Sequence, residues 1–217
     1  MKEKLKKIII IGSGGGALEI IDLIHSINKV EPTWNIVGFV GEKEKRHEKN
    51  FSSYDVIDSK ELNKFKDFYF VCSITSPKLK DKVIRKEVRS SNLVPATLIH
   101  PNSIISSTAI IKEGSVILSN VKIASNAKIG KHVWIDHNSL IGHDVQIESF
   151  SSIFPSSTVL GDVGKRCFVG AGSIIHQNAS VGTDSFIGIG TNIVNKIKPN
   201  SYIVNYQRII KKSNKNG

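Results

Sequence analysis

The sequence of 217 residues is poor in cysteine, proline and aromatic residues, and it has no long hydrophobic run. Its two cysteines, Cys72 and Cys167, match no metal-ligand or redox spacing, so we expect buried free thiols and no metal site. No stretch approaches the ~18 apolar residues of a membrane span, and the run at residues 8–11 is too short for a signal peptide. We therefore expect a folded cytoplasmic protein without membrane insertion.

Positive charge is plentiful, with a formal net charge of +11. Many lysines lie in the first residues, at 42–49 and at 211–215, where they are terminal or mixed with acids. They are not interleaved with aromatic residues, as they are in proteins that bind single-stranded nucleic acid. This distribution favours solvated surface and small anionic ligands, and it argues against a nucleic-acid partner.

The first half of the chain alternates strands and helices. The segment KKIIIIGSGGGALEIIDLIHSI predicts a strand from Lys6, a glycine-rich turn, and a helix with apolar residues at helical spacing over 18–27. Further strands are expected at 35–40 and 68–74, and a charged helix at about 77–89. This order predicts an α/β, Rossmann-like domain with a short parallel sheet, and the LIHPNSII segment divides the chain into domains 1–98 and 99–217.

In the second half a β-branched residue recurs at every sixth position. The positions form two series, and the step between them, across residues 160–162, is two residues shorter than the six-residue period. They are Ile105, Ile111, Ile117, Ile123, Ile129, Ile135, Ile141, Ile147, Ile153 and Val159, then Val163, Val169, Ile175, Val181, Ile187 and Ile193. A six-residue period is typical of a parallel β-helix in which the aliphatic residue of each unit points toward the axis. We expect this shorter step to tighten one corner of a coil.

The hexapeptide series resembles that of the left-handed β-helix acyltransferases. The preceding glycine-loop domain narrows the resemblance to sialic-acid O-acetyltransferases and N-acetyltransferases of nucleotide-linked 4-amino sugars, over nearly the full chain. It implies an all-β left-handed parallel β-helix, acetyl-CoA as co-substrate, a nucleotide-linked amino sugar as acceptor, and a homotrimer active in surface-glycan biosynthesis.

Three segments carry the site residues that this resemblance implies. IDHNSLIGHDVQI resembles the catalytic coil, with His143 as general base and Asp144 as its partner. FVGAGSII lies among the coils along the coenzyme A arm, and GSGGGALEIID resembles the nucleotide-sugar loop, whose amides and helix N-terminus suit a pyrophosphate. The cofactor-binding residues are Gly170, Ala171 and Gly188, and the substrate-binding residues are Gly12, Ser13, Gly14, Gly15, Gly16 and Glu42.

The chain departs from the family pattern at several positions. Gly16 and Leu18 stand where the family often has a histidine and a basic residue, and Ser152 stands where it has a second histidine. The usual Gly-x-Pro-Ala motif near the C-terminus is replaced by VNYQRIIKK from Val204. These changes concern contacts to the substrate and to coenzyme A.

Acetyl transfer to an amine needs a proton acceptor, and histidine titrates close enough to neutral pH to serve. Asp144 or Glu148 would orient the His143 ring. We expect His132, His137 and His176 to lie at surfaces or interfaces, with His137 the most plausible exception. The alternatives are O-acetylation of sialic acid or a related sugar, and a non-catalytic protein that binds nucleotide sugars. A dehydrogenase is disfavoured because the sheet is short and no acid ends the second strand before Gly41.

Overall fold

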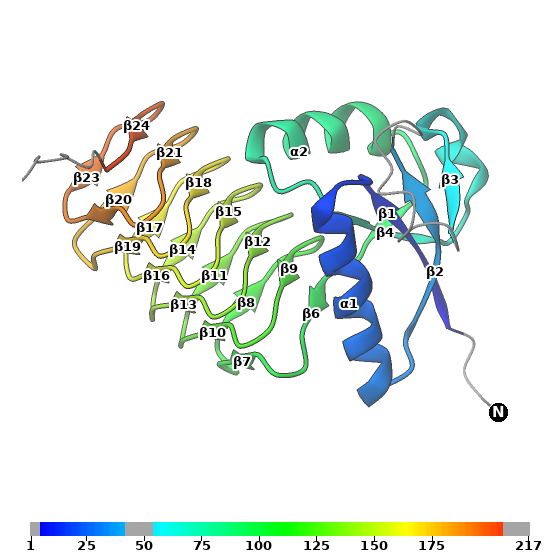
Figure 1. Cartoon of the computed structure of the whole chain (residues 1–217), viewed down its shortest axis with the longest axis horizontal. Helices are drawn as coiled ribbons and strands as arrows, with labels where there is room; N and C mark the ends of the chain where they lie inside the picture. The colour runs from blue at the N-terminus through cyan, green and yellow to red at the C-terminus, as the bar shows by residue number, and fades with distance from the viewer. Residues whose placement is uncertain (1–4, 42–53, 206–217) are drawn as a thin grey trace, which may run out of the picture.

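The computed structural model describes residues 5–41 and 54–205. The chain forms an α/β unit followed by a long stack of short strands, and helices α1 and α2 lie between the two parts (Figure 1). Within the described ranges, no helix is long and apolar enough to cross a membrane.

The α/β unit contains a parallel sheet of five strands in the order β3-β2-β1-β4-β5. Its elements are β1 (Lys6–Ile11), α1 (Gly15–Val30), β2 (Trp34–Val40), β3 (Asp55–Ile57), a 3₁₀ helix (Ser59–Lys64), β4 (Tyr69–Cys72), α2 (Pro77–Val83), a π-helical turn (Ile84–Val88) and β5 (Val94–Pro95). This is the strand order of Rossmann-like sheets, which bind ligands where the order reverses, at the carboxyl ends of the strands. Here the reversal lies between β1 and β4, next to the glycine-rich turn.

The second part is a parallel β-helix with three faces. We name its sheets by one strand each: the β12 sheet (β24-β21-β18-β15-β12-β9-β6), the β13 sheet (β22-β19-β16-β13-β10-β7) and the β14 sheet (β23-β20-β17-β14-β11-β8). The strands are β6 (Leu98–Ile99), β7 (Ile104–Ile105), β8 (Ile110–Ile111), β9 (Val116–Ile117), β10 (Lys122–Ile123), β11 (Lys128–Ile129), β12 (Trp134–Ile135), β13 (Leu140–Ile141), β14 (Gln146–Ile147), β15 (Ser152–Ile153), β16 (Thr158–Val159), β17 (Asp162–Val163), β18 (Phe168–Val169), β19 (Ile174–Ile175), β20 (Ser180–Val181), β21 (Phe186–Ile187), β22 (Asn192–Ile193), β23 (Lys196–Ile197) and β24 (Tyr202–Ile203). The first of these, β6, lies at the predicted domain boundary and pairs with β9.

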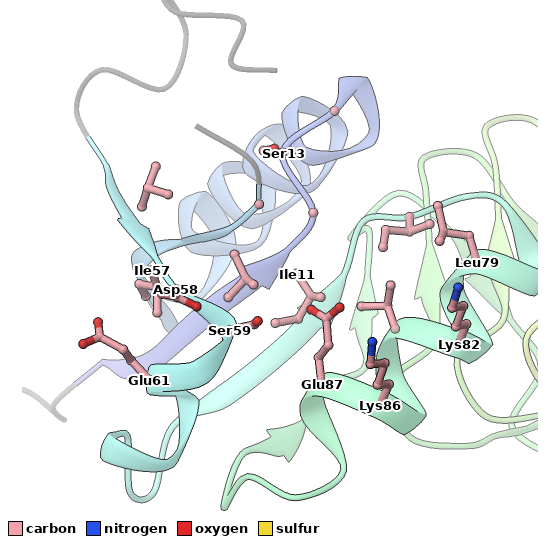
Figure 2. Close-up of a pocket in the computed structure, with 17 residues that line it drawn as sticks. Ile11, Ser13, Ile57, Asp58, Ser59, Glu61, Leu79, Lys82, Lys86 and Glu87 are labelled. Carbon is pink, nitrogen blue, oxygen red and sulfur yellow. The ribbon is translucent and has the colours of Figure 1, made fainter. Parts of the chain in front are cut away.

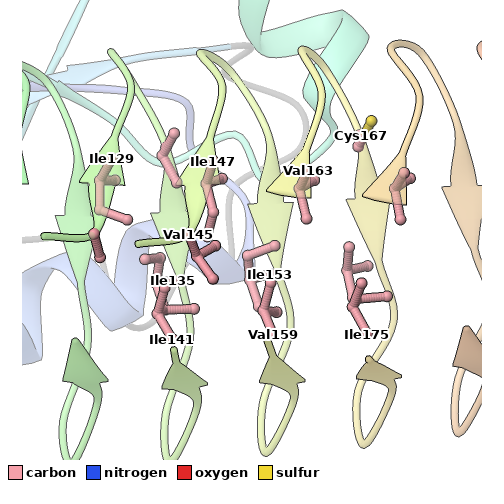
Figure 3. Close-up of a cluster of buried hydrophobic side chains, with 14 of the residues drawn as sticks. Ile129, Ile135, Ile141, Val145, Ile147, Ile153, Val159, Val163, Cys167 and Ile175 are labelled. Atoms are coloured by element: carbon pink, nitrogen blue, oxygen red, sulfur yellow. The ribbon is translucent and has the colours of Figure 1, made fainter. Parts of the chain in front are cut away.

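The aliphatic residue of each hexapeptide ends a strand and points into the interior, where the side chains stack from coil to coil (Figure 3). The shorter step at 160–162 lies at the corner between β16 and β17, and Val163 still pairs with Ile147, as the sequence predicts. A second four-residue step, from Ile193 to Ile197, was not predicted. Buried serines before the strands donate to carbonyl groups of the next coil, as Ser115 does to Gly130 at 2.8 Å.

The α/β unit packs on the outer face of the β12 sheet. Outward side chains of its first strands, Leu98, Val116 and Trp134, are buried in one cluster with Ile20 and Ile24 of α1. On the next strand, Ser152 accepts a hydrogen bond from Lys80 of α2 at 3.1 Å and donates to the carbonyl of Thr75 at 2.7 Å. The β12 sheet is therefore the face that carries the α/β unit.

Candidate functional site

A pocket of about 1000 Å³ opens at the carboxyl ends of β1 and β2. The glycine-rich turn forms one side and α2 with its π-helical turn the opposite side (Figure 2). Its polar lining consists of Gly12, Ser13, Gly14, Gly41, Asp58, Ser59, Glu61, Lys82, Lys86 and Glu87. The pocket thus contains the first half of the predicted nucleotide-sugar loop, while Glu42 lies outside the described residues.

The glycines of this turn have two different physical explanations. Gly12 has φ +110°, and a Cβ there would lie 2.6 Å from Ser73 Oγ, while a Cβ on Gly16 would collide with the Ser73 carbonyl oxygen. In this chain the close approach of Ser73 leaves no room for a side chain at these two positions. Gly14 and Gly15 have ordinary backbone angles, and a Cβ on either would meet nothing within 4 Å. The fold leaves open space over these two residues.

The same two residues begin α1. Gly14 is the N-cap, and no side chain caps the helix there. The N-terminus of a helix of this length carries a partial positive charge and free N–H groups, and both favour a phosphate. The open space therefore lies over backbone that is suited to an anion.

His143 lies at the corner between β13 and β14 and is 81% exposed. Its Nδ1 is 2.8 Å from Oδ2 of Asp144, which has φ +60° in the left-handed turn. Asn126 donates to the other oxygen of Asp144 at 3.0 Å. The hydrogen bonds from His143 and Asn126 hold the pKa of Asp144 below its usual value. An ionised Asp144 accepts a hydrogen bond from the Nδ1–H group, which leaves the unprotonated Nε2 as the proton acceptor that a general base needs.

The predicted coenzyme A residues lie along a different corner, between the β12 and β13 sheets. Gly170 is required by the fold, since a Cβ there would lie 2.7 Å from the Gly188 backbone, whereas a Cβ on Gly188 would meet first a side-chain atom of Val204 at 2.9 Å. The next residues outward, Gly172 and Gly190, have positive φ and open space around them. Ala171 accepts a hydrogen bond from Gly190 at 2.9 Å. Gly170 and Gly188 themselves are buried, and the exposed residues of this corner, here called the ridge, are Gly172, Ile189 and Gly190.

Within one chain these three groups of residues are not brought together. The α/β unit packs on the β12 sheet and holds the pocket among its own residues, whereas His143 lies at the corner of the other two sheets. In a three-sided coil that corner is opposite the β12 sheet. In one chain the pocket and His143 therefore lie on different sides of the β-helix.

The other coil histidines make structural contacts. His137 is hydrogen-bonded to Ser119 at 2.7 Å and to Glu19 of α1 at 3.1 Å, so it links the two units. His132 is buried and stacks between Phe70 and Phe150, and burial lowers its pKa to about 4. Cys72 and Cys167 are buried free thiols, as predicted.

Six polar side chains of the pocket are not among the site residues expected from the sequence: Asp58, Ser59, Glu61, Lys82, Lys86 and Glu87. The lysines belong to the charged helix, and their four-residue spacing was visible. Their position opposite the glycine turn depends on the tertiary fold, so no local pattern indicated it.

The chain is similar to one domain family in its first part and to several solved structures over nearly its full length. Residues 7–86 match the family model of the PglD N-terminal domain, and comparison with curated proteins gave no match. A complex of a histidine-to-alanine variant of GDP-perosamine N-acetyl transferase from Caulobacter crescentus with CoA and GDP-perosamine has a TM-score of 0.81 at 22% identity, covering 92% of this chain and 93% of that one. The acetyltransferase domain of PglB from Neisseria gonorrhoeae in complex with acetyl coenzyme A gives 0.81 and 22%, covering 92% and 96%. WeeI from Acinetobacter baumannii gives 0.77 and 19%, covering 92% and 97%.

These likenesses extend over both parts of the chain. They confirm the predicted fold, an α/β Rossmann-like unit followed by a left-handed parallel β-helix. At this level of identity they establish the fold of the molecule.

Proposed function

We propose that the protein transfers an acetyl group from acetyl-CoA to the amino group of a nucleotide-linked 4-amino-dideoxy sugar. The observation that carries the proposal is the pair of His143 and Asp144, which leaves the His143 Nε2 free on an exposed corner. The open glycine turn supports a nucleotide diphosphate as the other ligand. The solved relatives that bind CoA and GDP-perosamine have the same fold. A cytoplasmic location fits the use of acetyl-CoA.

In this mechanism the amine nitrogen attacks the thioester carbonyl directly. The C–N bond forms as His143 Nε2 takes the amine proton, and the carbon–sulfur bond then breaks. The proton passes from the imidazolium to the departing thiolate, so the products are the amide and free coenzyme A. Asp144 holds the ring with Nε2 outward and stabilises the imidazolium. No covalent enzyme intermediate is needed.

The site is proposed to form between two copies, as in the homotrimer that the sequence resemblance implies. One copy supplies the pocket of its α/β unit and the other supplies His143, while the ridge beside Gly170, Ala171 and Gly188 lies along the acetyl-CoA arm. This arrangement explains why a base lies on an outer corner, opposite the chain's own pocket.

The test is thiol release from acetyl-CoA with a panel of UDP-, dTDP- and GDP-linked 4-amino sugars and free sialic acids. Turnover of a nucleotide amino sugar is expected, with a loss of about 10²- to 10⁴-fold in His143→Ala. His176→Ala is the matched control, because His176 follows β19 at the same corner two coils further on. Turnover of sialic acid alone would instead indicate O-acetylation, and nucleotide-sugar binding without turnover would indicate a non-catalytic binding protein.

A further inference from the structure

The side of the pocket that faces the glycine turn carries two lysines from α2 and its π-helical turn. Lys82 and Lys86 are four residues apart and line the same pocket as Gly12, Ser13 and Gly14. In Figure 2 both side chains extend from this helix toward the cavity. Neither lysine forms an ion pair with any residue that the structure describes. Their charges are therefore available to a ligand.

The acidic residues of the pocket are only partly available as partners for these lysines. Asp58 accepts a hydrogen bond from the backbone N–H of Lys60 at 2.9 Å, and Glu61 is paired with Lys64 at 2.5 Å. Glu87 remains as the third acid of the lining. Two lysines thus lie across the cavity from the uncapped N-terminus of α1, and these two groups favour negative charge, while Glu87 next to Lys86 opposes it.

The helix that carries these lysines is fixed from its other side. Lys80 is 2% exposed and donates to Ser152 of β15, and Asp81 is 3.4 Å from Arg166, which also pairs with Asp184. The β-helix therefore holds one face of α2 while the opposite face lines the pocket. Lys82 and Lys86 are presented to the glycine turn from a helix whose position is set before a ligand arrives.

We propose that Lys82 and Lys86 bind the diphosphate of the nucleotide sugar from the side opposite the glycine turn. The diphosphate lies over Gly14 and Gly15, where the fold leaves open space, and its outer oxygens accept from the two ammonium groups. This inference rests on the proposed function, because it assigns residues to the acceptor site of that reaction. It makes the phosphates, rather than the sugar alone, a main determinant of acceptor affinity.

The experiment is calorimetric binding of GDP, UDP and dTDP, and of the corresponding nucleosides, to the full chain without acetyl-CoA. For the diphosphate that binds best, Lys82→Ala and Lys86→Ala should each weaken binding about 10-fold, because each removes a charge-assisted hydrogen bond. Affinity for the nucleoside should change less than about 2-fold, since a phosphate contact contributes nothing there. Both lysines are exposed, so the variants are expected to fold as the wild type does.

Lys78→Ala is the matched control, because Lys78 belongs to the same helix but lines a separate cleft of about 510 Å³. It should bind the diphosphate as the wild type does. If the Lys82 and Lys86 variants do so too, the inference is overturned while the proposed function stands. If the wild type binds no nucleoside diphosphate, both the inference and the nucleotide-sugar acceptor fail.

Discussion

The corner that carries His143 and the interface between the two units both hold ionisable side chains, but in opposite environments. At the corner, His143 is 81% exposed and Asp144 is 65% exposed, and neither side chain is covered by the fold. At the interface, His132 is 8% exposed and Lys80 is 2% exposed. Burial lowers the pKa of His132 to about 4 and that of Lys80 to about 8.

This difference in burial separates polar residues that affect the stability of the fold from polar residues that lie on its surface. The interface residues affect stability, because burial makes their charged forms costly. The corner residues are largely exposed, and their hydrogen bonds run to each other and to Asn126 of the preceding coil. Histidines at similar positions of the repeat, such as His132 and His143, therefore differ in burial according to whether the α/β unit packs on them.

The largest expected effect is the recovery of activity when two inactive variants are mixed. His143→Ala lacks the proposed base. Gly14→Asp places a carboxylate in the space proposed for the diphosphate, and the variant should fold because an N-cap position favours aspartate. Each variant alone should be nearly inactive. A 1:1 mixture, dissociated and reassembled, should recover about one quarter of the wild-type rate, since one site in four would combine both intact halves.

The control for this experiment is each variant taken separately through the same dissociation and reassembly. Thiol release from acetyl-CoA is the readout. A mixture that stays as inactive as its components would contradict a site that combines the pocket of one copy with the His143 of another.

A second effect concerns the pH dependence of stability at the interface. The pKa of His132 is about 4 in the folded chain against 6.5 for an ordinary histidine, so between these values the unfolded chain binds more protons. Stability should therefore fall as pH decreases from about 6.5 to 4, by about 3 kcal/mol from this residue. Urea unfolding across this range should show a shallower decline in His132→Phe.

Phenylalanine is a suitable replacement because Phe150 occupies the equivalent position of the next coil with φ +67°, close to the +55° of His132. His176→Ala serves as the exposed control and should keep the wild-type slope. An unchanged slope in His132→Phe would show that the interface is open to water.

A third effect comes from the buried charge of Lys80, which has no carboxylate partner among the described contacts. The folded pKa is about 8 against 10.5 for an ordinary lysine, so stability should rise as pH increases from about 8 to 10.5. Cys72, with its pKa raised to about 11 by burial, stays mostly neutral over this window. Lys80→Met should add about 1–3 kcal/mol at pH 7 and remove the slope. A loss of stability at pH 7 would mean that the Lys80–Ser152 hydrogen bond outweighs the cost of burying the charge.

The β-helix and the α/β unit differ in how much of their structure the sequence predicts. The repeat predicts the β-helix from β7 to β22, because each inward Ile or Val must stack on its equivalent in the next coil, as Ile141 does on Val159. The step from Ile193 to Ile197 is four residues long, so it falls outside the six-residue period by which the series was followed. Strands β3 and β5, of three and two residues, are too short to carry a pattern of their own.

The candidate site was predictable where backbone conformation restricts the residue type. Gly12 and Gly16 mark the turn in the sequence because a side chain would clash there. Lys82 and Lys86 follow no such rule, since a lysine on an exposed helix is usually solvated surface. Their position opposite the glycine turn depends on how α2 packs on β15, which only the tertiary fold decides.

The smallest expected effect tests whether the corner pair acts as a unit. Asp144→Asn keeps an oxygen near His143 but removes the charge that fixes Nδ1 as the donor and stabilises the imidazolium. Because this pair is largely exposed, we expect kcat to fall only about 10-fold, the value of one charge-assisted hydrogen bond. The melting temperature should be unchanged, because Asp144 supports no buried group. Steady-state kinetics beside thermal unfolding measures both, with Asp162→Asn at the neighbouring coil as control. A kcat equal to that of the wild type would show that His143 acts without Asp144.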